Sequence, residues 1–276
     1  MITGACMVPH PPIILPEVGR GEEKKIAATT ESFHKVGQAI AEAKPEVLII
    51  STPHSVMYGD YFHISPGKGA EGDMGLFRAP EVKFRADYDT ELVSRICEMA
   101  DDKGFPAGTE GERDPMLDHG VMVPLYFINK YYKGYKFVRA GLSGLSLKKH
   151  VEFGEMIRDA ADELGRRVYY VASGDLSHKL KESGPYGFDP AGPVYDDMIM
   201  KTMGAGAFEV LTDYDPGLLE SAAECGHRSF CILAGFLKGT KVTAEALSHE
   251  DVFGVGYGVC IFREKGGRRP PWKTNM

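Results

Sequence analysis

The chain has 276 residues, of which 43% are hydrophobic and 26% charged, a composition typical of a globular protein. Its formal net charge of −7, with no basic cluster to offset it, argues against nonspecific binding to nucleic acid. No apolar run is long enough to span a membrane and no signal peptide precedes the first strand, so we expect a cytoplasmic protein. The five cysteines are widely spaced and never form a Cys-x-x-Cys pair, which argues against a disulfide framework or a zinc ribbon.

The domain organisation is expected to be simple. The sequence contains no internal repeat, low-complexity block or Ser/Gly-rich linker. We therefore predict a single α/β domain over residues 1–263, with a mostly parallel or mixed central sheet and helices on both of its faces. Residues 264–276 are charged and rich in proline, and are expected to form a flexible tail.

The first predicted elements are a strand, a helix and a second strand. An apolar strand over 5–8 is followed by a helix over 22–44, which Pro45 terminates. The segment 47–51 is an unbroken apolar, β-branched run, which is typical of a buried strand in a parallel sheet. A strand, helix and strand in this order predict a right-handed parallel crossover.

The rest of the chain continues this alternation. The Gly-rich segment 67–75 is expected to be a mobile surface loop. Further strands are expected over 61–65, 82–86, 136–141, 167–173 and 254–262, and further helices over 88–103, 121–131, 147–165, 193–203, 207–212 and 216–237.

Four histidines lie at the boundaries of predicted elements. His10 and His54 each follow a strand in a Pro-His pair, and His178 follows a later strand. His119 lies near the start of a helix that Asp118 could cap. Ligands bind at the carboxyl ends of strands in open α/β sheets, so we expect these histidines to share one edge, with His10 and His54 on adjacent strands. The histidines with unremarkable neighbours are interpreted as surface or structural residues: His34, His63, His150 and His249.

Two neutral imidazoles and one carboxylate would bind a single metal ion and leave positions open for substrate and oxygen. Glu224 is the candidate carboxylate. If 216–237 formed one continuous helix, Glu224 would lie opposite its apolar stripe as a surface charge. Gly226 can break that helix and place Glu224, or Cys225 as the second choice, at a corner beside a new helix.

These segments together resemble the class III extradiol ring-cleavage dioxygenase superfamily, which includes the Memo proteins. The resemblance covers nearly the whole chain, and the order and spacing of its motifs are specific. It rests on Pro9-His10-Pro11-Pro12, Ser51-Thr52-Pro53-His54-Ser55, Asp118-His119-Gly120, Gly174-Asp175-Leu176-Ser177-His178 and the terminal GVGYGV strand.

The resemblance implies a specific site and reaction. His10, His54 and Glu224 would bind Fe(II), and His119 and His178 would act as the acid and base of the reaction. The substrates would be a catechol-like aromatic compound and O2, with ring opening beside the diol. His178 would take a proton from the substrate hydroxyl, and His119 would protonate or orient the reacting oxygen. The resemblance also implies a homodimer.

One departure from the dioxygenase pattern leaves alternatives open. The segment 224–228 reads Glu-Cys-Gly-His-Arg, and Cys-Gly at this place resembles the Memo branch. A thiolate ligand at Cys225 would favour copper or zinc over Fe(II). The second interpretation is therefore a Memo-like protein that binds copper, iron or zinc and a peptide or partner without cleaving rings. The third is a zinc-dependent hydrolase that uses the same cleft.

Overall fold

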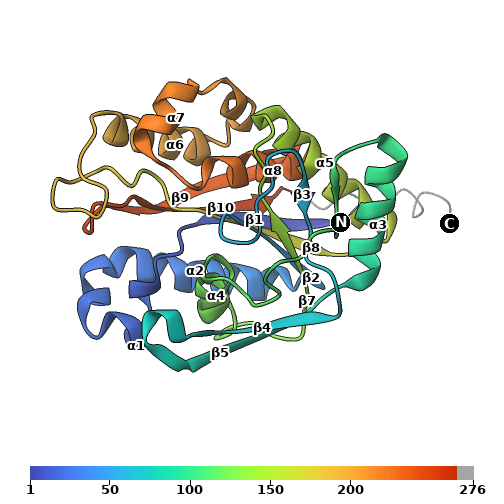
Figure 1. Cartoon of the computed structure of the whole chain (residues 1–276), viewed down its shortest axis with the longest axis horizontal. Helices are drawn as coiled ribbons and strands as arrows, with labels where there is room; N and C mark the ends of the chain where they lie inside the picture. Colours follow the sequence, from blue (N-terminus) through green and yellow to red (C-terminus); the bar gives the residue numbers. More distant parts are fainter. Residues whose placement is uncertain (266–276) are drawn as a thin grey trace.

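The structure is a computed structural model, and it describes residues 1–265. A six-stranded mixed sheet forms its middle layer, and helices cover both faces (Figure 1). The strand order is β7-β2-β8-β1-β10-β9. The strands are β1 (Ile2–Val8), β2 (Val47–Thr52), β7 (Lys136–Gly141), β8 (Val168–Ser173), β9 (Val242–Glu250) and β10 (Tyr257–Glu264). The first four strands of that order run parallel, whereas β10 is antiparallel to both of its neighbours. The predicted α/β class and mixed sheet are confirmed.

The helices form two layers, each over its own apolar core (Figure 1). One layer contains α1 (Pro16–Gly19), α2 (Ala27–Ala43) and α4 (His119–Ile128), and the other contains α3 (Thr90–Lys103), α5 (Leu147–Glu163), α6 (Ala191–Ala205), α7 (Pro216–Ala222) and α8 (His227–Leu237). Short 3-10 turns are η1 (Pro12–Ile14), η2 (Glu22–Ile26), η3 (Gly75–Phe77) and η4 (Phe208–Asp213). No helix within residues 1–265 is both long and apolar enough to cross a membrane.

The strand β2 shows why its sequence is apolar along most of its length. All six residues are buried, because β2 pairs with β7 and β8 and has helices on both faces. The strand order corrects one sequence prediction: β8 lies between β1 and β2, so His10 and His54 do not follow adjacent strands. The two histidines instead lie on either side of the end of β8.

The segment 67–75 also differs from its prediction as a mobile loop. Most of it forms β4 (Gly69–Met74), which pairs with β5 (Ala79–Asp87) in an antiparallel hairpin. A Cβ atom at Gly69 would lie 2.3 Å from the carbonyl oxygen of Ala86, and one at Gly72 would lie 2.8 Å from that of Leu117. These glycines permit close packing rather than flexibility. A separate short pair joins β3 (Phe62–His63) and β6 (Ala107–Gly108).

Two further differences occur in the last part of the chain. The edge strand β9 is absent from the sequence prediction, because its residues are half-exposed and include charged side chains, which weakens the strand pattern. The last strand, β10, begins at Tyr257 and extends to Glu264, one residue beyond the predicted domain. Of the predicted tail, residues 266–276 lie outside the described part of the chain.

Candidate metal centre

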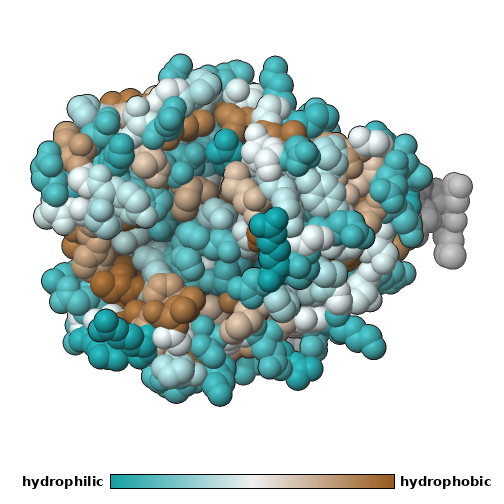
Figure 2. Space-filling model, viewed as in Figure 1, coloured by the Kyte–Doolittle hydropathy of each residue, from teal (hydrophilic) through white to brown (hydrophobic). Residues whose placement is uncertain are grey.

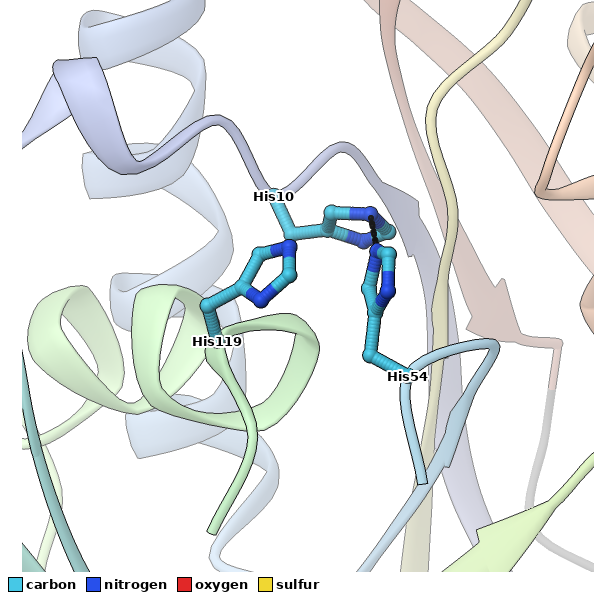
Figure 3. A group of neighbouring side chains, drawn as sticks. All are labelled: His10, His54 and His119. Carbon is cyan, nitrogen blue, oxygen red and sulfur yellow. Dashed lines mark hydrogen bonds between the residues drawn. The ribbon is translucent and has the colours of Figure 1, made fainter. Parts of the chain in front are cut away.

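Three histidines from distant segments converge at the carboxyl edge of the sheet (Figure 3). His10 follows β1, His54 follows β2, and His119 is the first residue of α4. The Nε2 atoms of His10 and His54 lie 2.9 Å apart, and the ring centroids of His54 and His119 lie 3.9 Å apart. The structure therefore brings together the two predicted metal-binding histidines and one of the two predicted acid or base residues.

His10 is held by two neighbouring side chains and is only 1% exposed. Its backbone N–H donates to Oδ1 of Asp175 at 2.8 Å, and its Nδ1 lies 2.9 Å from the hydroxyl of Ser173. The Ser173 hydroxyl donates its one proton to the carbonyl oxygen of Gly120, so it accepts from Nδ1–H of His10. This bond leaves the lone pair of His10 on Nε2, the atom that faces His54.

A second set of potential metal ligands shares His10. Sγ of Cys225 lies 3.7 Å from His10 Nε2, and Oδ2 of Asp175 lies 3.9 Å from the same atom. The ligand atoms of these three residues all lie within 4.8 Å of one another. The backbone N–H of Asp175 also donates to the Cys225 sulfur at 3.2 Å.

Cys225 reaches the centre because the chain turns between α7 and α8. The structure confirms the predicted break at Gly226, since α7 ends at Ala222 and α8 begins at His227. A Cβ atom at Gly174 would lie 2.1 Å from Cα of Gly226, so the exit of β8 and the start of α8 are in backbone contact. This contact fixes Cys225 beside His10.

Glu224 lies elsewhere. Its Oε2 accepts the backbone N–H of His227 in the first turn of α8, and the residue lines a cavity of about 680 Å³ with Arg228 and the start of α5. Burial raises the pKa of its carboxyl to about 7. Glu224 is in neither ligand cluster among the described residues, so its assignment as a ligand stays a prediction from the sequence.

His178 lies beside this centre rather than inside it. Its Nδ1 donates to the carbonyl oxygen of Ala223 at 2.6 Å, and its Nε2 lies 4.0 Å from Oδ2 of Asp175. The ring also contacts Tyr186, with the centroids 5.1 Å apart. Because Nδ1 is committed to a carbonyl, Nε2 is the atom able to exchange a proton.

Burial controls the charge of these groups. It lowers the pKa of His10 well below its usual value, and the neighbouring His54 lowers it further. The pKa of His119 falls to about 3, from burial and then from His54 and His10. Burial also lowers the pKa of His54. These imidazoles are therefore neutral at pH 7, which is the form that binds metal.

The donor set fits a single metal ion. Two nitrogens that bind one ion at about 2.0–2.1 Å lie about 2.9 Å apart for a right-angled arrangement and about 3.4 Å apart for a tetrahedral one. The separation of the His10 and His54 Nε2 atoms is 2.9 Å. Burial raises the pKa of the Cys225 thiol, but a metal ion deprotonates a coordinating thiol.

Asp175 is a candidate functional residue that the sequence prediction does not include. Its carboxylate is 7% exposed, and the same burial raises its pKa, an effect that the nearby histidines oppose. The available signal was its position, because Gly174-Asp175 directly follows the β8 strand. A carboxylate at the end of a strand between the two histidine-bearing strands is a natural candidate for a shared site.

Comparison with known proteins shows the family of this chain. Residues 4–260 match the family described as the catalytic LigB subunit of aromatic ring-opening dioxygenase. The chain belongs to the LigB family. The 2-aminophenol 1,6-dioxygenase beta subunit of a Pseudomonas species is 24% identical over 94% of this chain and 92% of its own length.

Two further proteins and one solved structure are similar to this LigB-family chain. The protein CA_C1420 of Clostridium acetobutylicum is 43% identical over 94% of this chain, and a MEMO1 family protein of Methanopyrus kandleri is 28% identical over 63% of it. The matches span 57% and 55% of the lengths of these two relatives, respectively. The crystal structure of the uncharacterized protein JW3007 from Escherichia coli has the same fold, with a TM-score of 0.62 at 15% identity over 94% of this chain and 99% of that one.

Proposed function

We propose that this LigB-family chain binds one Fe(II) ion between His10 and His54 and oxidises a catechol-like or aminophenol-like aromatic substrate with O2. The observation that carries the proposal is the pair of neutral imidazoles whose Nε2 atoms are 2.9 Å apart at the end of the sheet. The 2-aminophenol dioxygenase relative supports the substrate class. When bound, the ion would supply two things: coordination of the substrate oxygens or nitrogen, and activation of O2.

The third ligand in this proposal comes from the end of β8 or the α7–α8 turn. Cys225 and Asp175 both approach His10 Nε2, at 3.7 and 3.9 Å. Asp175 would complete a set of two histidines and one carboxylate, which suits Fe(II) oxygen chemistry. Glu224 would need to give up its bond to the His227 N–H to take that place.

The neighbouring histidines would move protons. The Nδ1–H of His178 is fixed to a carbonyl, so its Nε2 is suited to accept the proton of a substrate hydroxyl. His119 stays neutral because its pKa is about 3, so it can donate a hydrogen bond to an oxygen bound beside it without carrying a charge. Phe77, whose ring centroid lies 5.3 Å from that of His119, would shield this side from water.

The space-filling view supports an apolar ligand. Figure 2 shows a hollow in the middle of this face, with hydrophobic surface gathered beside it over the region of α1 and η3. Leu76 in η3 is 95% exposed and lies next to Phe77, which contacts His119. A patch of exposed apolar surface of this kind is typical of a ligand-binding site.

A second candidate function is a Memo-like metal-binding protein without ring-cleaving activity. The observation that favours it is the Cys225 sulfur at 3.7 Å from His10 Nε2, since thiolate ligands favour copper or zinc. The MEMO1 family relative agrees with this alternative. A zinc-dependent hydrolase would use the same ligands with a bound water as nucleophile.

One experiment separates these functions. The protein is purified without oxygen, its metal content is measured, and the Fe(II)-loaded form is mixed with catechol, protocatechuate and 2-aminophenol while O2 is monitored. We expect one iron per chain and consumption of O2 with at least one of these compounds. Stoichiometric iron without O2 consumption would favour the Memo-like protein, and activity only with zinc toward an ester or amide would favour the hydrolase.

A further inference from the structure

A buried arginine lies behind the metal centre. Arg139 is part of β7 and only 2% exposed, although its neighbours Phe137, Val138 and Ala140 are apolar core residues. Removing a guanidinium from water is unfavourable unless its donors are satisfied. The acceptors of its N–H groups therefore show which part of the structure the Arg139 side chain holds in place.

The Arg139 side chain organises the segment that precedes α4. Its Nε donates to the Ser65 hydroxyl at 2.5 Å, and its Nη1 donates to the carbonyl oxygen of Met116. Its Nη2 donates to the carbonyl oxygen of Asp114 at 3.2 Å and to Glu112 Oε2 at 3.4 Å. Three of these four partners belong to residues 112–116, so the guanidinium fixes the approach of the chain to His119.

Asp118 connects this arginine to the end of β2. Its Oδ2 lies 3.8 Å from Arg139 Nη1, and its Oδ1 accepts the hydroxyl proton of Thr52 at 2.7 Å. Asp118 occupies the N-cap position of α4, but its side chain accepts no N–H of that helix. Its carboxylate therefore links Arg139 in β7 to Thr52 in β2 at the start of α4, and does not act as an ordinary helix cap.

The chain of contacts from Arg139 through Asp118 and Thr52 reaches two of the three histidines of the centre, His54 and His119. Thr52 gives its proton to Asp118, and its oxygen accepts the backbone N–H of His54 at 3.2 Å. On the other side, Asp118 directly precedes His119. A Cβ atom at Gly120 would lie 2.4 Å from the Thr52 hydroxyl oxygen, so the helix start is pressed against the end of β2.

We propose that Arg139 is a positioning residue that sets the spacing of His54 and His119 through Asp118 and Thr52. This inference rests on the proposed metal site at His10 and His54. His10 is held separately, by Ser173 and Asp175, so the Arg139 connection acts on the opposite half of the centre. Loss of such supporting contacts typically weakens metal affinity by about 10- to 100-fold.

The test compares Arg139→Met and Arg139→Lys with Ile157→Ala, a cavity-forming control in α5 on the other face of the sheet. Co(II) serves as the probe, because its visible spectrum reports the arrangement of its ligands. We expect Arg139→Met to lower Co(II) affinity by about 10- to 100-fold and to change the spectrum, and Arg139→Lys to recover part of both. Ile157→Ala should lose thermal stability yet keep the wild-type affinity and spectrum.

A double variant asks whether the effect passes through Thr52. If Arg139 and Thr52 act in one connection, Arg139→Met with Thr52→Val should weaken Co(II) binding little more than the stronger single variant. Independent, multiplying losses would contradict the proposed route. Wild-type affinity and spectrum in Arg139→Met would overturn the inference and leave the metal site intact.

A measurement without metal keeps the inference separate from the proposed function. If the wild-type protein bound no Co(II) or Fe(II), the proposed function would fail. The imidazole ¹⁵N and ¹H NMR signals of His54 and His119 in metal-free protein then test whether Arg139 positions the two rings. Displaced signals in Arg139→Met, with unchanged signals in Ile157→Ala, would support positioning by Arg139, and unchanged signals in both would overturn it.

Discussion

Two groups of histidines in this protein have different surroundings. His150 belongs to α5 and His227 to α8, on one face of the sheet, and each side chain is fully buried. His150 binds the Ser146 carbonyl with Nδ1 and the Ser143 N–H with Nε2, and His227 binds the Leu211 carbonyl and the Tyr195 hydroxyl. At the candidate metal centre, by contrast, the Nε2 atoms of His10 and His54 face each other at 2.9 Å.

The difference that marks the candidate centre lies in the partners of the rings and not in the direction of their pKa shifts. Burial lowers the pKa of His150 and of His227 to about 4, and that of His119 to about 3. A depressed pKa alone therefore does not identify a ligand. What identifies the centre is that its ring nitrogens converge on one point, whereas those of the structural pair each have a separate hydrogen-bonding partner.

The largest expected effect comes from replacing one histidine of each group. His10→Ala should abolish stoichiometric metal binding, because it removes the one residue that both ligand clusters share. His150→Ala should keep the metal and lose about 2–4 kcal/mol of unfolding free energy, since it deletes a buried ring and removes the hydrogen-bond partner of the Ser143 N–H. Metal analysis and chemical denaturation of the two variants check both statements.

The control for this pair is the fold of metal-free His10→Ala. If its metal loss came only from misfolding, its near-UV circular dichroism would differ from that of wild type. Equal metal loss in a well-folded His150→Ala would contradict the division into two groups.

An intermediate effect is expected at the turn between α7 and α8. Cys225→Ala should weaken metal binding by about 10- to 100-fold, because the sulfur is close to His10 Nε2. Glu224→Ala should leave metal affinity unchanged and cost about 1 kcal/mol, since its carboxylate serves the N–H of His227. Isothermal titration with metal and urea unfolding measure the two quantities.

The opposite pattern at this turn would restore the sequence-based assignment. Metal loss in Glu224→Ala with retention in Cys225→Ala would mean that the glutamate moves to His10 when metal binds. Such a result would favour the dioxygenase-like ligand set over the thiol-containing one.

The most gradual effect is the pH dependence of the stability of the metal-free protein. A histidine whose folded pKa is about 3 or 4 and whose unfolded pKa is about 6.5 binds more protons when unfolded, so stability falls as pH drops below about 6.5. Each such residue contributes up to about 1.4 kcal/mol per pH unit. We expect His119→Gln and His150→Gln each to flatten the pH profile of unfolding between about pH 6.5 and 4.

Added metal distinguishes the two groups in that profile. Saturating Zn(II) at neutral pH should raise the stability of the wild type and of His150→Gln, but not that of His10→Ala. Equal stabilisation of all three proteins would place the metal somewhere other than at His10.

Much of the fold could be predicted from local pattern. The apolar run of β2 and the periodic helices α2, α3 and α5 are recognisable because each buries a complete face or stripe. The strand β4 is hidden because Gly69 and Gly72, which permit close backbone contact there, resemble loop residues, whereas its partner β5 contains the predicted strand over 82–86. The edge strand β9 is hidden because a half-exposed strand lacks a clear hydrophobic alternation.

The site was predictable only in part, and the missing part is spatial. His10 and His54 carry a local signal, since each follows a strand in a Pro-His pair. The place of β8 between their strands, which makes Asp175 a neighbour of both, depends on strand order and is not encoded locally. The choice between Glu224 and Cys225 likewise depends on the direction of a turn, set by the contact of Gly174 with Gly226.

The most direct test of the proposed metal site is anomalous diffraction from crystals grown without oxygen in the presence of Fe(II), measured at the iron edge. We predict a single peak about 2.0–2.2 Å from both His10 Nε2 and His54 Nε2, with a third ligand from Cys225 or Asp175. A peak in the cavity beside Glu224 and Arg228, or none near His10, would contradict this prediction.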